Sequence, residues 1–406
     1  MNDVAAAEIR QLAFLEGPGI AEPLRAALAT LGRGLDSWFL TQVHHRPGAG
    51  ATGIYEVASS TAGNSTTSFL CATTARIPSG DPNVVTLNGP DGLRLAVWNH
   101  PEDPLLPGLP WACDGQAVGQ ALFAGQPTVV RTVSYRPLRR AVLVAESGGA
   151  TRYLKVLRNG NAEPMKRRHS LLTGAGVPAP GLMDVPGQEI VAMMPAEGTP
   201  LAELLLRNGA DGLAADTLLD LLRRLPDGAM KLPERLAWAV RVRDYAKGAV
   251  AVLPDHSARI SHLADGVHRL VNSTDAGPKV PSHGDFYEAN LLVTGNEVTG
   301  LLDVDALGPG HLVDDLACFV AHLAVLPALD PRYVHVPAAL ERFMHAFDAH
   351  VDPAALRARA AGVVVTLIAG AKHSSHHGRD ASWQADALER LGIAEELFRS
   401  ARGLAH

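Results

Sequence analysis

The sequence has 406 residues, of which 47% are hydrophobic and 19% are charged, and its formal net charge at pH 7 is −6. A chain of this length exceeds one compact core, so we expect two or three folding units. The negative charge balance and the lack of a basic stripe exclude nucleic acid as an expected partner. Three scattered cysteines argue against a disulfide framework or a zinc site, which fits a reducing cytosol.

The N-terminus carries acidic residues early and lacks the basic and then apolar pattern of a secretory signal. The longest apolar runs fall short of the roughly 20 residues that a membrane span needs. We therefore expect a cytoplasmic protein without a membrane partner. The sequence gives no indication of the oligomeric state.

Residues 1–125 form the first predicted unit. They begin with a helical pattern at about 4–31, followed by strand-like runs at 53–59, 67–76 and 84–100. In the last run, Asp91-Gly92 lies between two apolar stretches, which is the turn chemistry of a β-hairpin. The Pro-rich stretch 100–110 cannot form a regular element and indicates a boundary. No chemical motif is recognisable in this segment, so its role stays open.

Residues 126–195 show a sharper pattern. Short strands are predicted at 129–135, 141–146 and 152–157, followed by a helix at 163–174 and an apolar strand at 190–194. These elements predict a small antiparallel sheet with one helix packed on it. Residues 196–406 are mainly helical, apart from two short strands at 291–294 and 298–302 around the Gly295-Asn296 turn. The predicted fold class is α+β, with a β-rich lobe, a larger helical lobe and an extra N-terminal α/β segment.

The segment HGDFYEAN, residues 283–290, carries the clearest chemistry. If the intervening residues form a tight loop, Asp285 and Asn290 face the same point. A carboxylate there accepts the proton of a substrate hydroxyl, and an amide oxygen holds a metal. Asp303 ends the apolar strand that follows, where a carboxylate suits a hard ligand for Mg²⁺. An Asp-x-x-x-x-Asn spacing alone arises by chance, but the hairpin and the terminal Asp make chance a poor explanation.

The run HGDFYEANLLVTGNEVTGLLDVDALGPGHLVDDLACFVAHL, residues 283–323, resembles the signature of the aminoglycoside phosphotransferase and choline kinase superfamily. This resemblance implies a two-lobed protein-kinase-like fold, ATP as co-substrate, Asp285 as catalytic base, and Asn290 and Asp303 as Mg²⁺ ligands. It further implies that Asp315 braces the catalytic loop and that His283 orients it. For Asp315 the alternative is a helix cap, and Asp305 either assists the metal or faces solvent. Some members of the superfamily carry an N-terminal cap, which residues 1–125 resemble only by position.

Lys155 lies on the third strand of the small lobe, where it is either a solvated residue of the outer face or the lysine that grips the ATP phosphates. The turn before the second strand has no GxGxxG; instead Arg136, Arg139 and Arg140 are candidates for phosphate contact, with solvated turn residues as the alternative. Backbone groups near Met194 would pair with adenine.

The usual partner of the strand lysine is a Glu on the next helix. Either Glu163 reaches Lys155, or His169 occupies the place and the ion pair is absent.

The predicted function is transfer of the ATP γ-phosphoryl group to a hydroxyl of a small polar acceptor, such as an aminoglycoside, an amino sugar, a sugar or an amino alcohol. ATP versus GTP stays open. The alternative is a pseudokinase-type nucleotide-binding or regulatory module without turnover. Too few residues separate Asp303 from the next helix for a regulated activation loop, which disfavours a protein substrate. Neighbouring histidines at 373–377 are interpreted as a solvated loop rather than a metal site.

Overall fold

The computed structural model describes residues 3–46, 48–61, 64–88, 92–373 and 382–405. It divides into two compact units, the first made of Met1–Lys166 and Leu182–Pro195, the second of Arg167–Gly181 and Ala196–His406. The chain passes from the first unit to the second within helix α5 (Ala162–Gly174). Residues 374–377 of the histidine-rich stretch lie outside the described residues.

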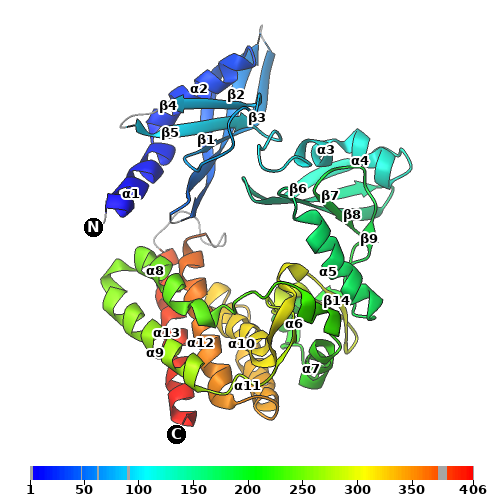
Figure 1. Ribbon diagram of the computed structural model, residues 1–406, viewed down its shortest axis with the longest axis vertical. Coiled ribbons are helices and arrows are strands. Elements are labelled where there is room, and N and C mark those ends of the chain that lie inside the picture. Colours follow the sequence, from blue (N-terminus) through cyan, green and yellow to red (C-terminus); the bar gives the residue numbers. More distant parts are fainter. Residues whose placement is uncertain (1–2, 47, 62–63, 89–91, 374–381, 406) are drawn as a thin grey trace. The chain divides into compact units, whose positions relative to one another are not determined.

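The first unit begins with two helices and a five-stranded antiparallel sheet of order β1-β2-β3-β5-β4. Helices α1 and α2 run along this sheet (Figure 1). Their apolar side chains, Leu15 and Leu24 among them, pack with Tyr55 and Val97 of the sheet into one core. The predicted hairpin at 84–100 is confirmed by the antiparallel pairing of the last two strands, although residues 89–91 of its turn are not described. The elements are α1 (Asp3–Glu16), α2 (Ala21–Thr30), β1 (Gly34–Arg46), β2 (Gly50–Thr61), β3 (Asn64–Thr73), β4 (Val84–Asn88) and β5 (Arg94–Asn99).

Strand β1 was not predicted from the sequence. It is an edge strand, and its pairing with β2 shifts register between Leu35 and Ser37 and again between Leu40 and Gln42. Each bulge adds a residue and breaks the two-residue alternation on which strand prediction depends.

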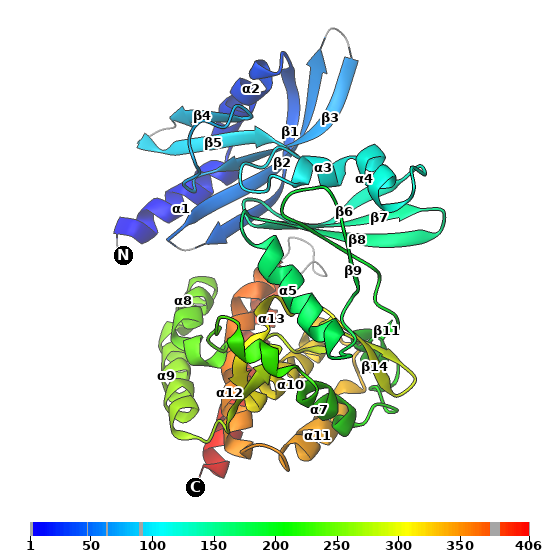
Figure 2. The same cartoon turned by 45° about the vertical axis from the view of Figure 1, so that its right-hand side comes forward.

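The first unit also contains a second antiparallel sheet, of order β6-β7-β8-β10-β9. Its first three strands, the following helix and the apolar strand agree with the predicted elements to within a residue or two. Two short helices cover this sheet and were not predicted (Figure 2). The first begins at Leu109, inside the Pro-rich stretch that was expected to form no regular element. The elements are α3 (Leu109–Cys113), α4 (Gly115–Leu122), β6 (Val129–Arg136), β7 (Arg140–Ser147), β8 (Ala150–Leu157), β9 (Leu182–Met183) and β10 (Ile190–Met193).

The second unit is mainly helical. Its helices are α6 (Leu201–Asn208), α7 (Ala215–Arg223), α8 (Val242–Val252), α9 (Ser257–Ser273), α10 (Leu312–Leu329), α11 (Val336–Phe347), α12 (Pro353–Ile368) and α13 (Ser382–Leu404). Helix α10 and the segment that begins with α12 are long and apolar enough to cross a membrane by length and composition alone, but most of each is buried inside the protein. The burial is typical of core helices.

Three short strand pairings among the described residues of the second unit position the segment that carries the motif. Strand β12 (Lys279–Ser282) pairs with β15 (Gly308–His311), and β13 (Leu291–Thr294) pairs with β14 (Glu297–Leu301) and with β11 (Thr199–Pro200). Segment 283–290 connects β12 to β13, and segment 302–307 connects β14 to β15. Since Ser282 is opposite Gly308 and Leu291 is opposite Leu301, the two segments are held side by side at both ends.

Candidate active site

The two connecting segments are joined by hydrogen bonds as well as by the strands at their ends. The imidazole of His283 donates through Nε2 to the carbonyl of Leu302 over 3.0 Å, and the Leu302 N–H donates to the carbonyl of Asn290 over 2.8 Å. The side-chain amide of Asn290 donates to the carbonyl of Asp285 over 2.9 Å. These bonds bring together the three residues that the sequence predicted as a site, Asp285, Asn290 and Asp303.

Electrostatics show the same grouping. The Tyr287 hydroxyl lies in this loop, and its pKa is raised by burial and, to a smaller extent, by the carboxylates of Asp285, Glu288 and Asp303. The hydroxyl of one half-buried tyrosine therefore interacts with the negative charge of both segments.

His283 is completely buried, and burial lowers the pKa of its imidazole to about 4. The ring is therefore neutral near pH 7, with its proton on Nε2 facing Leu302. A histidine held in this way joins two backbone segments. Its contacts fit the predicted orienting role.

Asp315 lies near the N-terminus of α10 and is 1% exposed. One carboxylate oxygen accepts the N–H of His283 over 2.9 Å, and the other accepts the N–H of Gly284 over 2.7 Å. Gly284 has a φ of 77°, and a Cβ there would lie 2.9 Å from the Cβ of Ala306. Glycine is therefore required at this position, because a side chain meets both a left-handed backbone and a close neighbour.

Asp303 also adopts a left-handed backbone, with φ 51° and ψ 57°. Such a conformation costs a non-glycine residue roughly 1 kcal/mol or more and often occurs at functional sites. Nearby, Asp305 acts electrostatically on Arg168, whose guanidinium donates to the carbonyl of Leu307 over 3.2 Å. Sequence reasoning missed Arg168, because it lies 139 residues before its partner and has no motif of its own.

Glu288 is a second acid of the loop and is 4% exposed. Burial raises the pKa of its carboxyl to about 7, and its Oε2 has no hydrogen-bond partner among the described residues.

The described residues contain no group of three or more His, Cys, Asp or Glu side chains able to enclose a metal ion. Asn290 and Asp303 offer one amide oxygen and one carboxylate, both hard oxygen donors. Mg²⁺ commonly binds proteins through one or two such ligands and takes the rest from phosphates and water. The donor set therefore fits a magnesium ion that arrives with a nucleotide.

In the first unit, Lys155 lies in the middle of β8, opposite Val142 of β7 and Val191 of β10. Its side chain is 7% exposed, so the alternative of a solvated lysine on the outer face is wrong. Met194 directly follows β10 and is 40% exposed.

The turn between β6 and β7 carries the three predicted arginines. Arg136 and Arg139 are exposed, Arg140 is half-buried, and Pro137 and Leu138 between them are buried. The two candidate partners of Lys155 each have another partner. The exposed carboxylate of Glu163 pairs with Lys166 over 2.9 Å, and the buried His169 bonds through Nδ1 to the carbonyl of Pro180 over 3.2 Å.

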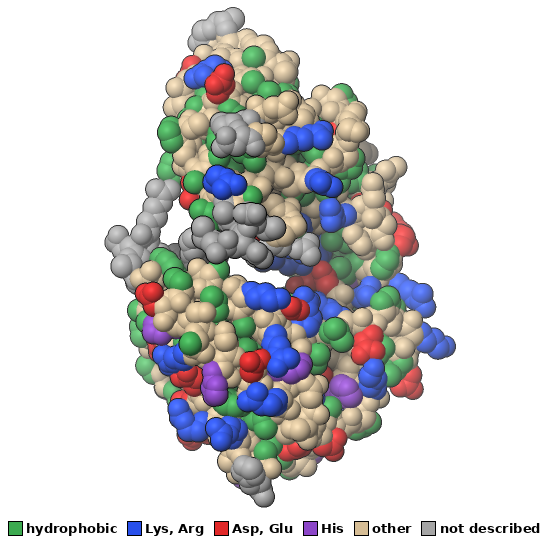
Figure 3. Space-filling view, turned by 60° about the vertical axis from the view of Figure 1, so that its left-hand side comes forward, with side chains coloured by type: hydrophobic (Ala, Val, Ile, Leu, Met, Phe, Trp, Pro, Cys, Tyr) green, Lys and Arg blue, Asp and Glu red, His purple; other side chains and the backbone are tan. Residues whose placement is uncertain are grey.

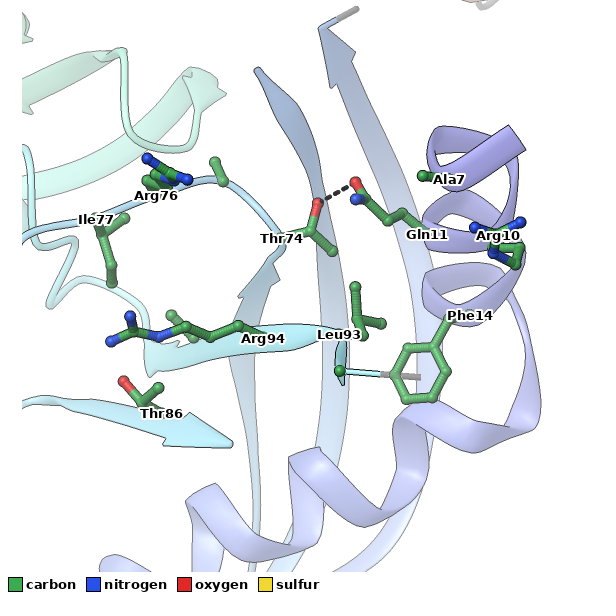
Figure 4. Close-up of a pocket in the computed structure, with 13 residues that line it drawn as sticks. Ala7, Arg10, Gln11, Phe14, Thr74, Arg76, Ile77, Thr86, Leu93 and Arg94 are labelled. Atoms are coloured by element: carbon green, nitrogen blue, oxygen red, sulfur yellow. Dashed lines mark hydrogen bonds between the residues drawn. The ribbon is translucent and has the colours of Figure 1, made fainter. Parts of the chain in front are cut away.

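A separate cavity of about 760 Å³ lies between α1 and the strands of the first sheet. In Figure 4, Gln11 and Thr74 meet across it through a 2.8 Å hydrogen bond, with Arg76 and Arg94 on one side. None of the predicted site residues lines this cavity. On the face shown in Figure 3, positive and negative side chains alternate over the helical unit without a continuous basic stripe.

Solved structures of known proteins share the fold of this chain. The fold is similar to that of a thermostable mutant of aminoglycoside phosphotransferase APH(4)-Ia solved with ADP and hygromycin B, at 13% identity and a TM-score of 0.50 over 71% of this chain and 98% of that one. A choline/ethanolamine kinase family protein from Mesorhizobium loti is 16% identical with a TM-score of 0.48, over 71% of this chain and 97% of that one. A Plasmodium vivax ethanolamine kinase is 12% identical with a TM-score of 0.45, over 68% of this chain and 84% of that one. The first of these similarities shows that the fold is kinase-like, as predicted.

The family follows from the sequence. The model of the phosphotransferase enzyme family matches residues 138–359, more than half of the chain, so the chain belongs to this family. No curated protein matches the sequence.

Proposed function

We propose that the protein is a small-molecule kinase that transfers the γ-phosphoryl group of ATP to a hydroxyl of a small polar acceptor. Membership of the phosphotransferase family supports the reaction type. The observation that carries the proposal is the pair of joined segments, which groups Asp285, Asn290 and Asp303 through His283 and Leu302.

In the proposed reaction Asp285 accepts the proton of the acceptor hydroxyl. The hydroxyl oxygen then forms a bond to the γ-phosphorus, and the bond from that phosphorus to the β–γ bridging oxygen breaks to release ADP. The backbone bonds to Asp315 and the Nε2 bond of His283 keep the base in place, so that little motion is needed during the transfer. Asn290 and Asp303 would hold Mg²⁺, which supplies positive charge to the phosphate oxygens.

The nucleotide site is assigned to the first unit. Lys155 would hold the α- and β-phosphates, which fits a lysine buried in the central region of a sheet. Arg136, Arg139 and Arg140 would contact phosphates from the β6–β7 turn, and backbone groups at Met194 would pair with adenine.

A small acceptor fits the short connection between Asp303 and α10, because segment 304–311 contains a 3-10 turn and strand β15 and leaves no free loop. The acceptor classes that we propose are aminoglycosides, amino sugars, sugars and amino alcohols. APH(4)-Ia, a structural relative, was solved with ADP and the aminoglycoside hygromycin B.

An ATP-depletion screen of the full chain against these four acceptor classes tests the proposal. We expect one class to give Mg²⁺-dependent turnover that Asp285→Asn abolishes. Binding of MgATP without turnover on any acceptor would instead favour the pseudokinase alternative, and turnover that survives in Asp285→Asn would contradict the assigned base.

A further inference from the structure

A buried carboxylate connects the N-terminal segment to the turn that carries the arginines. Asp103 lies in the Pro-rich stretch after β5 and is 4% exposed. Its Oδ1 accepts the N–H of Leu105 over 2.9 Å. Its Oδ2 accepts two further bonds, from the Tyr135 hydroxyl over 2.7 Å and from the Leu138 N–H over 2.8 Å. Both of these donors belong to β6 and the β6–β7 turn.

Leu138 adopts a conformation that a leucine rarely takes. Its φ is 62°, which costs an L-residue roughly 1–2 kcal/mol. Two contacts offset this cost: the bond to Asp103 and the burial of the side chain, which is 7% exposed. The side chain packs with Ile54, Cys71 and Trp98, which come from β2, β3 and β5 of the first sheet.

The Tyr135 hydroxyl is the centre of the same junction. The indole N–H of Trp98 donates to it over 3.4 Å, the thiol of Cys71 lies 3.8 Å away, and the ring of His100 packs edge-on with centroids 5.0 Å apart. Since Cys71 and Trp98 are opposite each other on paired strands, the junction rests on the sheet rather than on a loose tail. Residues of the segment 1–125 therefore fix the backbone of the β6–β7 turn.

In protein kinases the equivalent turn is a flexible glycine-rich loop that covers the phosphates. Here the turn has no glycine, and its buried Pro137 and Leu138 are flanked by exposed Arg136 and Arg139. Because contacts with segment 1–125 fix the backbone of the turn, the two arginines start from a defined backbone position. Less conformational entropy is therefore lost when they bind a phosphate.

We propose that the N-terminal segment acts as a brace: it holds the arginine-bearing turn in the conformation that binds the phosphates of the nucleotide. Asp103 and Tyr135 are the positioning residues for this turn. This inference rests on the proposed use of ATP. Neither residue touches the nucleotide; each acts through the backbone of Leu138 and its neighbours.

The test compares two matched substitutions in the full chain. Tyr135→Phe removes the hydroxyl that bonds Asp103, and Tyr55→Phe removes a buried hydroxyl that bonds the Leu15 carbonyl over the same 2.7 Å, in the core of the same unit but in a different cluster. Calorimetry measures the binding of MgATP and of adenosine. We expect Tyr135→Phe to weaken MgATP binding about fivefold, the scale of one hydrogen bond, and to leave adenosine binding unchanged. Tyr55→Phe should change neither, because a loss of stability alone does not distinguish the two ligands.

Hydrogen exchange at the Leu138 and Arg139 amides, measured without nucleotide, tests directly whether Asp103 and Tyr135 fix the backbone of the turn. Exchange should accelerate in Tyr135→Phe and in Asp103→Asn and stay unchanged in Tyr55→Phe. Equal MgATP affinity in Tyr135→Phe and Tyr55→Phe, or unchanged exchange at Leu138 in Asp103→Asn, would overturn the brace. A native chain that binds no MgATP would instead overturn the proposed function, whatever the exchange shows.

Discussion

Each of the two units fixes one turn with a buried aspartate from a distant part of the chain. In the helical unit, Asp315 accepts the N–H groups of His283 and Gly284 and so holds the segment that contains Asp285. In the first unit, Asp103 accepts the Tyr135 hydroxyl and the Leu138 N–H and so holds the arginine-bearing turn. Both units thus satisfy the hydrogen-bond donors of an irregular segment in the same way, because the two oxygens of one carboxylate can accept several hydrogen bonds at once.

The two segments that these aspartates hold differ in the function that we assign to them. We assign the transfer step to the segment that Asp315 holds and nucleotide affinity to the turn that Asp103 holds. Damage to the segment that Asp315 holds should therefore appear mainly in kcat, and damage to the turn that Asp103 holds mainly in binding of the triphosphate.

Asp285→Asn should have the largest effect. It leaves both aspartate braces intact but removes the proton acceptor, so we expect kcat to fall about 10³-fold while MgATP affinity stays close to native. Steady-state kinetics with an acceptor found in the screen, together with calorimetry, measure the two quantities. Asp244→Asn, on the exposed face of α8 beside Lys247, is the control and should behave as the native chain.

Lys155→Met should come next. The methionine fills similar volume on β8 but offers no charge, so MgATP affinity and kcat should both fall, with kcat reduced about 100-fold. Adenosine binding should persist, because it does not involve the phosphates. Lys166→Met removes a half-buried lysine that pairs with Glu163 and is the matched control. Native kinetics in Lys155→Met would refute the placement of Lys155 at the phosphates.

Asp315→Asn and Asp103→Asn test the comparison directly. Each substitution keeps the shape of the side chain but presents an amide N–H to a donor, and each should lower the free energy of unfolding by about 2 kcal/mol, measured by urea denaturation. In Asp315→Asn we expect kcat to fall at least tenfold with little change in MgATP affinity, because the segment that carries the base shifts. In Asp103→Asn the opposite pattern is expected. The same pattern in both variants would mean that the two turns do not have separate tasks.

The sequence predicts the role of Asp315 but gives no indication of the role of Asp103. Asp285, Asn290, Asp303 and Asp315 fall within about 30 residues, around one hairpin turned at Gly295, so their order along the chain nearly determines their positions. The contacts of Asp103 with Tyr135 and Leu138 have a similar sequence separation, but they lie outside any recognisable motif and join the stretch after one sheet to a strand and a turn of another. No periodicity reports such contacts.

Similar reasons account for the other elements that were missed. The bulges of β1 conceal its alternation, and Arg168 reaches the segment around Asp305 only through the fold. The helical pattern of residues 233–252 predicts one helix, but α8 begins only at Val242. Residues 233–241 instead contain one 3-10 turn, at Ala239–Arg241, and Arg235 stacks over Trp238 at 4.6 Å. Tertiary contacts thus override the local helical pattern there.

At neutral pH the smallest effect is expected from His322→Phe, whose influence on stability appears only in acid. His322 on α10 stacks on Tyr287 of the motif segment with ring centroids 4.1 Å apart. Burial and, to a smaller extent, the charge of Arg390 lower the pKa of its imidazole to about 4. An unfolded histidine binds a proton below about pH 6.5, whereas His322 in the folded protein binds one only near pH 4, so unfolding takes up a proton in this window. The native chain should therefore lose up to about 3 kcal/mol of unfolding free energy through this residue as the pH falls from 6.5 to 4.

Phenylalanine keeps a ring against Tyr287 but cannot titrate, so the unfolding free energy of His322→Phe should fall less steeply than that of the native chain between pH 6.5 and 4. Urea denaturation at several pH values in this range measures the difference. His262→Phe, at an exposed position of α9, is the control and should retain the native slope. His283 is buried with a similarly lowered pKa and contributes to the same window, so part of the acid sensitivity should persist in His322→Phe. Identical slopes in the native chain and in His322→Phe would contradict this prediction. They would show that His322 binds its proton in the folded protein as readily as in the unfolded chain, so that its contact with Tyr287 contributes nothing to the loss of stability in acid.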